Sequence, residues 1–344
     1  MGTKELLEET KLHFSTDKKP GFTRKKHGNT FTYYTTEDKK ITDTSVLERI
    51  KNLHIPPAWE NVWICPSAKG HLQAVGYDSK GRKQYRYHKE WTEAAQENKF
   101  ESLLLFAQVL PKLRRYINAD MSLPGIPRKK VIATIIWLLE NTLIRIGNEE
   151  YKEENDTLGL TTLGNKNVDI RGNMLKFQFK GKSGVYHSIR VQSKKVAKII
   201  RRCQHLPGQD LFEYIDEEGN VDSINSSDVN NYLKNITGLE ITAKEFRTWG
   251  GTISAARFLS DHGTLTDEKE VKKVVTDVVK KVAHELGNKP ATSRKYYIHP
   301  YVFKAYTEGH TLSNLTIKPN NKQKSYNQLY DVEKKVVYLL LDES

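Results

Sequence analysis

The stretch LKFQFKGKSGVYHSIRV (175–191) decides the fold class of this chain. Apolar side chains alternate with polar ones on both sides of a glycine-bounded turn, GKSG (181–184). This period of two is typical of a β-hairpin that buries one face. Because the flanking sequence is helical in character, we expect a hairpin or small sheet between Val168 and Val191 that is embedded among helices.

Three apolar segments around the hairpin have helical spacing. The first, Glu101–Ile117, contains Pro111, which we expect to bend or divide the helix. The second, Lys129–Ile146, is apolar on nearly all sides, as in a helix buried inside a domain, and Gly147 is expected to end it. The third begins near Thr266 and carries a stripe of valines along one face.

The first 90 residues have a different pattern, in which short alternating runs are separated by turns and interrupted by one helix at 45–53. The runs are Phe31–Thr36, Val62–Cys65, His71–Tyr77 and Gln84–His88. We therefore predict an α+β protein: a small mixed, β-rich N-terminal domain at 1–90 and a larger, mainly helical domain with the embedded hairpin at 91–344. A polar stretch at 318–327 is expected to link the latter to a short C-terminal helix.

The composition is that of a globular protein, with 37% hydrophobic and 28% charged residues. No apolar run approaches the roughly 18 residues of a membrane-spanning helix. The start, MGTKELLEETKLHF, lacks the features of a secretory signal, and the separated Cys65 and Cys203 suggest neither a disulfide framework nor a zinc site. A cytoplasmic location is expected.

Positive charge is the first functional indication. The chain has 55 Lys and Arg against 42 Asp and Glu, a net charge of +13. Such a field attracts polyanions, and nucleic acid is the commonest partner. Basic runs recur along the chain, which favours a surrounded ligand over one basic tail, although any single run also fits an ordinary solvated surface.

The sequence has no recognisable machinery for ATP or metal ions. It lacks a phosphate-binding Gly-Lys-Ser/Thr loop, and no acidic or His/Cys cluster has metal-ligand spacing. A basic protein of this kind would act on phosphates with its own cations and a side-chain nucleophile. Phosphodiester chemistry needs cations on the non-bridging oxygens, a nucleophile, and an acid for the leaving oxygen.

Two arginines suit the first role. Arg145 is placed at the end of the predicted buried helix, where a charge is costly unless an anion meets it. Arg247 lies between Phe246 and Trp249 and is followed by two glycines that allow close backbone approach. Structural salt bridges with nearby glutamates are the alternative for both.

A lysine and a tyrosine complete the candidates. Lys182 projects from the tight hairpin turn, where it could enter a DNA groove or simply be solvated. Tyr297 follows Arg294 and Lys295, and such cations would stabilise a phenolate nucleophile. Packing in a core is the alternative, and the residues alone do not separate Tyr297 from Tyr296.

These contexts, in this order, resemble the type IB DNA topoisomerases of the poxvirus-like and bacterial branch over nearly the whole chain. The stretch GYDSKGRKQYRYHKEW (76–91) is similar to a DNA-contacting strand of that family, with Gln84, Tyr85 and Tyr87 at the contacting positions. LIRIGNEEY (143–151) resembles the signature of the first catalytic arginine. The resemblance implies that Arg145 has that role.

The remaining motifs extend the resemblance. The turn of FKGKSGVYHSIRV (179–191) places the family's general-acid lysine on Lys182. KEFRTWG (244–250) resembles the box of the second arginine, Arg247, with Lys244 as an auxiliary cation. GNKPATSRKYYIHP (287–300) is similar to the nucleophile segment, and the family's spacing from Asn288 leads to Tyr297.

Asn288 departs from the poxvirus and eukaryotic pattern, which has histidine there. An amide can donate a hydrogen bond to a non-bridging oxygen but carries no charge. We expect Asn288 to act as an oxyanion donor. Bacterial members are similar in using asparagine, which favours a bacterial source and a place near the nucleoid.

The resemblance implies a monomer that clamps duplex DNA, preferably supercoiled, cuts one strand through a 3′-phosphotyrosine, allows strand rotation and reseals the break without ATP, metal or cofactor. A tyrosine recombinase would share this chemistry but typically has His-x-x-Arg where this chain has Lys244-x-x-Arg247. A DNA-packaging protein would explain the charge alone, but not the four site contexts.

Overall fold

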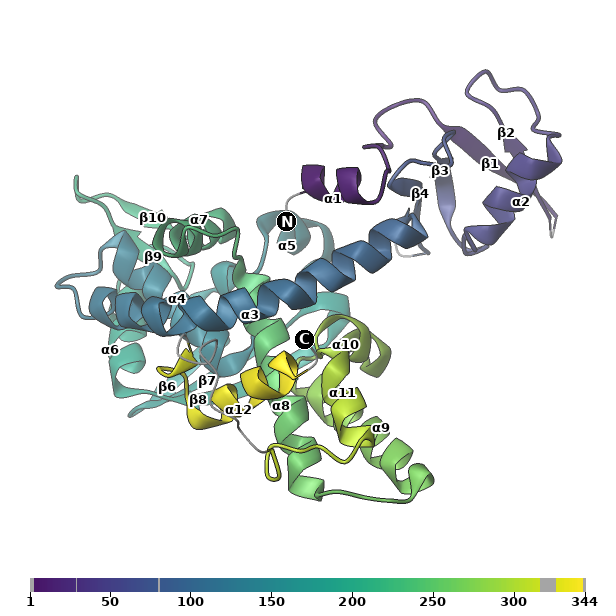
Figure 1. Ribbon diagram of the computed structural model, residues 1–344. Coiled ribbons are helices and arrows are strands. Elements are labelled where there is room, and N and C mark those ends of the chain that lie inside the picture. Colours follow the sequence, from purple (N-terminus) through teal and green to yellow (C-terminus); the bar gives the residue numbers. More distant parts are fainter. Residues whose placement is uncertain (1–2, 29, 80, 316–325, 343–344) are drawn as a thin grey trace. The chain divides into compact units, whose positions relative to one another are not determined.

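The computed structural model describes residues 3–28, 30–79, 81–315 and 326–342. The chain forms two compact units, Met1–Glu101 and Ser102–Ser344 (Figure 1). The boundary expected after residue 90 falls in the first turn of α3 (Lys89–Asp120), a helix whose residues belong to both units. The α+β class is confirmed, with an antiparallel sheet in the N-terminal unit and a mainly helical C-terminal unit.

The N-terminal unit is built on one antiparallel sheet with strand order β2-β1-β3-β4-β5. Its small core includes Ile50, Ile64 and Ala74. Strand β1 was not expected, because its basic side chains are mostly exposed and leave no apolar alternation. The elements are α1 (Thr3–Glu9), β1 (Phe22–His27), β2 (Thr30–Tyr34), α2 (Thr44–Asn52), β3 (Glu60–Ile64), β4 (Leu72–Tyr77) and β5 (Lys83–Tyr87).

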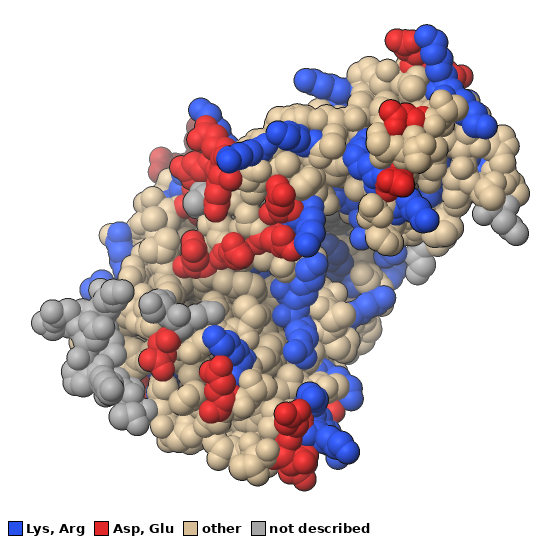
Figure 2. Space-filling model, turned by 45° about the vertical axis from the view of Figure 1, so that its right-hand side comes forward, with Lys and Arg blue, Asp and Glu red and all other residues tan. Residues whose placement is uncertain are grey.

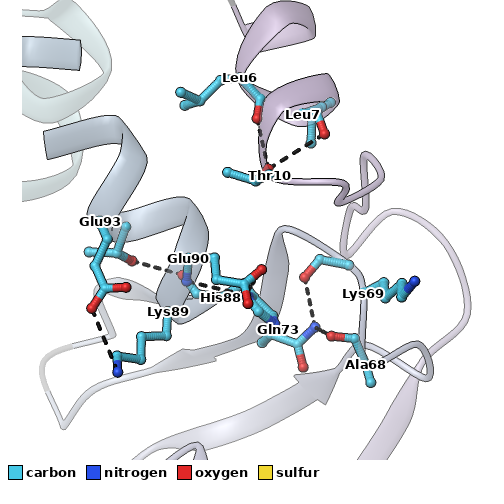
Figure 3. A network of polar contacts seen from close by, with 12 residues as sticks. Leu6, Leu7, Thr10, Ala68, Lys69, Gln73, His88, Lys89, Glu90 and Glu93 are labelled. Carbon is cyan, nitrogen blue, oxygen red and sulfur yellow. Dashed lines mark hydrogen bonds and ion pairs between the residues drawn. The ribbon is translucent and has the colours of Figure 1, made fainter. Parts of the chain in front are cut away.

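A buried glutamine fixes one loop of this unit. The side-chain amide of Gln73, on β4, donates hydrogen bonds to the carbonyl oxygens of Ser67, Ala68 and Gly70, over 3.0, 3.1 and 2.7 Å. Figure 3 shows this amide facing the loop. Because the buried amide is satisfied by backbone oxygens, it holds the connection between β3 and β4 in one conformation.

The C-terminal unit packs helices against one face of a three-stranded antiparallel sheet, β6-β7-β8. After α3, the elements are α4 (Arg128–Thr142), α5 (Glu149–Asn155), η1 (Leu160–Thr162), η2 (Asn165–Asn167), β6 (Val168–Arg171), β7 (Met174–Lys180), η3 (Lys182–Gly184), β8 (Tyr186–Gln192), α6 (Lys194–Cys203), β9 (Glu213–Ile215), β10 (Val221–Ser223), α7 (Ser226–Thr237), α8 (Ala243–His262), α9 (Glu268–Glu285), α10 (Pro290–Tyr296), α11 (Pro300–Thr307) and α12 (Asp331–Leu341).

The embedded hairpin is confirmed. In the β7–β8 register, Leu175 pairs with Val191, and Phe177 pairs with Ile189. Leu175 and Phe177 are fully buried, whereas the alternate positions of β8 are exposed. One face of the sheet therefore joins the core, and the turn that carries Lys182 projects from its end.

Pro111 does not divide α3, because fully buried Leu110 and Leu113 on either side hold the helix in the core. A bend at Pro111 stays a prediction. The expectation about the end of the next helix was wrong. Helix α4 ends at Thr142 rather than at Gly147, because Leu143 adopts a left-handed conformation with φ of 54° and its N–H caps the carbonyl of Leu139.

The expected C-terminal helix is present as α12, which packs on α8 and α11. Residues 318–325 of the polar stretch lie outside the described residues. Within the part of the chain that the structure describes, no helix is long and apolar enough to cross a membrane.

Candidate active site

Arg145 lies in an irregular segment after α4, not on the helix. The N–H of Leu160 donates to the carbonyl of Arg145 over 2.9 Å, and the N–H of Thr161 donates to that of Ile146 over 2.7 Å. A Cβ atom at Gly159 would come within 2.7 Å of the Arg145 carbonyl oxygen, so the glycine permits this close approach. The backbone of Arg145 is thereby fixed, and its side chain is half-buried.

Asn288 is positioned by the end of α9. The N–H of Gly287 donates to the carbonyl of His284, and that of Asn288 to the carbonyl of Ala283 over 2.8 Å. With Gly287 at a φ of 57°, these bonds form a Schellman motif. The side-chain oxygen of Asn288 accepts a hydrogen bond from the Arg145 guanidinium. The amide group is therefore oriented with its nitrogen turned away from Arg145.

Arg247 is the most buried of the candidate cations, with 4% of its surface exposed. It lies on α8, which begins with a capping box between Thr242 and Glu245. Its guanidinium donates to the carbonyl oxygens of Leu143 and Leu286, the residues that end α4 and α9. Helix ends thus hold the arginine by their unpaired carbonyl groups.

Tyr297 lies directly after α10 and faces Arg247. The Arg247 guanidinium carbon is 5.2 Å from the centre of the Tyr297 ring, within the range of a cation–π contact. The backbone carbonyl of Tyr297 lies against Gly251, where a Cβ atom would come within 2.5 Å of the carbonyl oxygen. Tyr297 is half-buried, whereas Tyr296 is 40% exposed and lies near Lys295. The two adjacent tyrosines therefore have distinct environments.

Lys182 shares the electrostatic field of this group. Partial burial of its ammonium group, together with repulsion from Arg145, lowers the pKa of Lys182, and Lys244 and Arg247 act in the same direction, whereas Tyr297 opposes them. Lys244 is exposed in the first turn of α8. A lysine with a lowered pKa releases its proton more readily, as a general acid must.

The two arginines of the site do not form ion pairs with carboxylates of the described residues. The salt-bridge alternative for Arg145 and Arg247 is therefore wrong. Burial and the charge of Arg145 lower the pKa of Arg247 to about 10, with Tyr297 opposing the shift. Burial also lowers the pKa of Arg145. Two buried donors, Arg247 Nε and Asn288 Nδ2, have no hydrogen-bond partner among the residues that the structure describes. Such a set fits a tetrahedral anion.

The expected DNA-contacting residues of the N-terminal unit lie on β5. Tyr85 and Tyr87 are 47% and 45% exposed, and their rings stack with centres 6.1 Å apart. The Gln84 amide donates to Asp78 over 3.1 Å. The two exposed tyrosines share a face of β5 with Lys83, whose ammonium pairs with Asp17 over 2.6 Å, and exposed aromatic and basic side chains of this kind can contact nucleic acid. Figure 2 shows further Lys and Arg side chains gathered in a row near the middle of the face drawn.

Comparisons with known proteins identify the family. A model of the eukaryotic DNA topoisomerase I catalytic core matches residues 83–325, and a model of the bacterial DNA topoisomerase IB N-terminal domain matches residues 30–78. The chain belongs to the type IB DNA topoisomerases. This membership makes it an isomerase that acts on DNA and relaxes it, and it separates the chain from recombinases and packaging proteins.

Viral type IB topoisomerases are among its relatives. The chain is 33% identical to DNA topoisomerase 1B of Acanthamoeba polyphaga mimivirus over 83% of its own length and 87% of the relative's. It is 26% identical to DNA topoisomerase 1 of Rabbit fibroma virus, over 81% and 88%. The value for DNA topoisomerase 1B of Vaccinia virus (strain Copenhagen) is 24%, over 79% and 86%. A bacterial source for this topoisomerase stays a prediction.

Two features of the topoisomerase site escaped sequence reasoning. His187 on β8 was not singled out from the sequence, yet its ring lies against Gly287, next to Asn288. Glu333 of α12 accepts a hydrogen bond over 3.1 Å from Nε1 of Trp249, which lies two residues after Arg247. Both contacts join distant parts of the chain. The sequence feature that could have indicated the His187 contact is the pair of glycines, Gly181 and Gly287, each of which immediately precedes a candidate residue.

Proposed function

We propose that this topoisomerase relaxes DNA through a 3′-phosphotyrosyl intermediate on Tyr297, without ATP or a metal ion. The observation that carries the proposal is a pair of buried donors, Arg247 Nε and Asn288 Nδ2, that find no acceptor within the described part of the chain and lie in a cluster that also holds Tyr297. A phosphodiester supplies the oxygens that these donors lack. It also supplies the electrophile that a tyrosine beside them can attack.

In the proposed cleavage step, the Tyr297 oxygen attacks the scissile phosphorus, and the bond from phosphorus to the 5′ oxygen breaks. The phenol proton passes to solvent, and Lys182 gives a proton to the departing 5′ oxygen. Arg145, Arg247 and Asn288 donate hydrogen bonds to the non-bridging oxygens as charge develops there. Each such donor typically contributes a factor of about 100 to 1,000 in rate.

Religation reverses these steps. The 5′ hydroxyl attacks the phosphotyrosine, its proton returns to Lys182, and Tyr297 leaves. Because the covalent bond conserves the energy of the phosphodiester, ATP is not needed, and the fixed cations take the place of a metal ion. Strand rotation between the two steps is driven by torsion in the DNA, which would favour supercoiled substrates.

DNA binding is proposed to involve both units, as a monomeric clamp around the duplex. Gln84, Tyr85 and Tyr87 would contact DNA from the N-terminal unit, and Lys244 would contact a phosphate near the site. The net charge of +13 supports this, since neutralised phosphates supply most of the affinity of such proteins for DNA.

The test is relaxation of negatively supercoiled plasmid in EDTA without ATP. We expect the natural protein to relax the plasmid, Tyr297→Phe to be inactive, and Tyr296→Phe, the matched control, to remain active. Binding without relaxation by the natural protein, or activity that survives in Tyr297→Phe, would overturn the proposal.

A further inference from the structure

The ring of His187 lies between the two segments that carry Lys182 and Asn288. His187 pairs with Phe179 across β7 and β8, and their rings stack with centres 5.0 Å apart and planes 18° apart. The other contacts are with glycines. A Cβ atom at Gly181 would come within 2.6 Å of His187 Nε2, and one at Gly287 would overlap the ring.

The backbone conformation alone does not explain why glycine occupies both positions. Gly181 has a φ of −94°, which any residue can adopt, so its missing side chain is explained by the imidazole rather than by the turn. Gly287 needs a left-handed φ of 57° and also the space for the ring. Each glycine immediately precedes a candidate site residue, Lys182 in one case and Asn288 in the other.

The two segments differ in how firmly they are held. Asn288 is locked by the backbone hydrogen bonds that end α9. The turn that carries Lys182 is closed by two backbone hydrogen bonds, from the N–H of Gly181 to the carbonyl of Val185 and from the N–H of Gly184 to the carbonyl of Gly181. It is nevertheless exposed and contains two positive φ angles, 66° at Ser183 and 77° at Gly184. Loss of the ring would therefore release the lysine turn rather than the end of α9.

We propose that His187 is a positioning residue that holds the Lys182 turn against the end of α9 through the shape of its ring. The inference rests on the proposed role of Lys182 as the general acid. The imidazole acts here as a flat, uncharged spacer between Phe179 and the two glycines, and it donates no proton to the reaction.

The charge state of the ring agrees with this role. Burial, and then repulsion from Arg145 and Arg247, lower the pKa of His187 to about 4. The imidazole is therefore neutral near pH 7 and adds no charge to a site already rich in cations. Phenylalanine, which is flat and uncharged, is consequently the conservative substitution.

The experiment measures single-turnover cleavage of one duplex with either oxygen or sulfur at the 5′ bridging position. A thiolate leaves without a proton, so loss of general-acid catalysis slows the oxygen substrate alone. We expect His187→Ala to slow the oxygen substrate on the order of 10- to 100-fold, since a shift of about 1 Å can have that effect, and to leave the sulfur substrate nearly unchanged. His187→Phe should recover most of the rate.

One further variant keeps the proposal falsifiable if His187→Ala folds poorly. Gly181→Ala should slow the oxygen substrate alone, because the added methyl group displaces the ring. Two combinations test the coupling directly: adding Gly181→Ala to His187→Ala should cause no further loss, and His187→Ala should have no additional effect in a Lys182→Ala background. Equal slowing of both substrates, no recovery with phenylalanine, or an additive loss with Lys182→Ala would overturn the proposal.

The same assay tests the proposed function separately. If Lys182→Ala slows both substrates equally, Lys182 is not the general acid, and the proposed mechanism fails whatever His187 does. If the sulfur substrate restores the cleavage rate of Lys182→Ala but not that of His187→Ala, the mechanism stands and the positioning role of His187 is wrong.

Discussion

At the scale of single residues, Asn288 has two separable tasks. Its oxygen accepts a hydrogen bond from Arg145, and its nitrogen is a buried donor with no acceptor in the described ranges of the chain. A carboxylate would keep the first and abolish the second, while adding negative charge beside the proposed phosphate position. An imidazole can still donate a hydrogen bond from one nitrogen.

We therefore predict opposite outcomes for two substitutions at this position. Asn288→Asp should reduce the cleavage rate by about 100-fold or more, the usual effect of losing an oxyanion donor. Asn288→His should retain relaxation. Single-turnover cleavage measures both, and complete inactivity of Asn288→His would contradict the placement of Asn288 in the site.

The lowered pKa of Lys182 predicts a pH dependence. A general acid acts only when protonated, so the cleavage rate should fall as pH rises through the pKa of Lys182 in the folded protein. Because burial and the charge of Arg145 lower the pKa of Lys182, this fall should occur at a lower pH than for an ordinary lysine. Lys182→Ala should be slower and lack this limb in a pH–rate profile, and a limb that persists would assign proton donation to another group.

The candidate residues could be named from the sequence because their motifs stand in a fixed order. The contacts that position these residues could not be predicted. Arg145 was placed on a helix, whereas the structure has it in a segment pinned by Leu160 and Gly159. That error arose because the left-handed conformation of Leu143 has no sequence signal. The proposed role of His187 depends on its contact with Gly287, 100 positions away, and no local sequence pattern reports such a contact.

At the scale of elements, α12 is tied to α8 and α3 through one carboxylate. Glu333, with 7% of its side chain exposed, accepts from Arg114 over 2.7 and 2.9 Å and from Trp249. Arg114 also pairs with Glu140 of α4. The helical periodicity of these segments could be predicted from the sequence. The buried ion pair between Arg114 and Glu333 could not, because it depends on how the helices pack against one another. The C-terminal helix thus supports the helix that carries Arg247.

Removing this carboxylate should destabilise the C-terminal unit. Glu333→Ala removes one carboxylate partner of Arg114 and the acceptor of Trp249 Nε1, while Glu140 still compensates the charge of Arg114. Leaving buried donors without an acceptor costs roughly 1–3 kcal/mol. Lys272→Ala, which removes an exposed pair with Glu268, is the matched control and should change stability by less than about 1 kcal/mol. Denaturant unfolding measures both, and equal effects would contradict the supporting role of α12.

At the scale of the whole molecule, all the candidate catalytic residues belong to the C-terminal unit, whereas Gln84, Tyr85 and Tyr87 belong to the N-terminal unit. A chain that begins at Lys89, where α3 begins, should therefore still form the covalent complex, but should need more DNA and lose binding at lower salt than the full chain. Titration of covalent complex against DNA concentration measures this. Equal salt dependence of the two chains would contradict a DNA-binding role for the N-terminal unit.

The central claim is that Tyr297 becomes joined to the 3′ end of the broken strand. The most direct test is to trap the complex on a duplex whose cleaved strand cannot be resealed, digest the protein, and identify the modified peptide by mass spectrometry. We predict a nucleotide 3′-phosphate attached to Tyr297. Attachment to Tyr296 or another residue, or linkage through a 5′-phosphate, would contradict it.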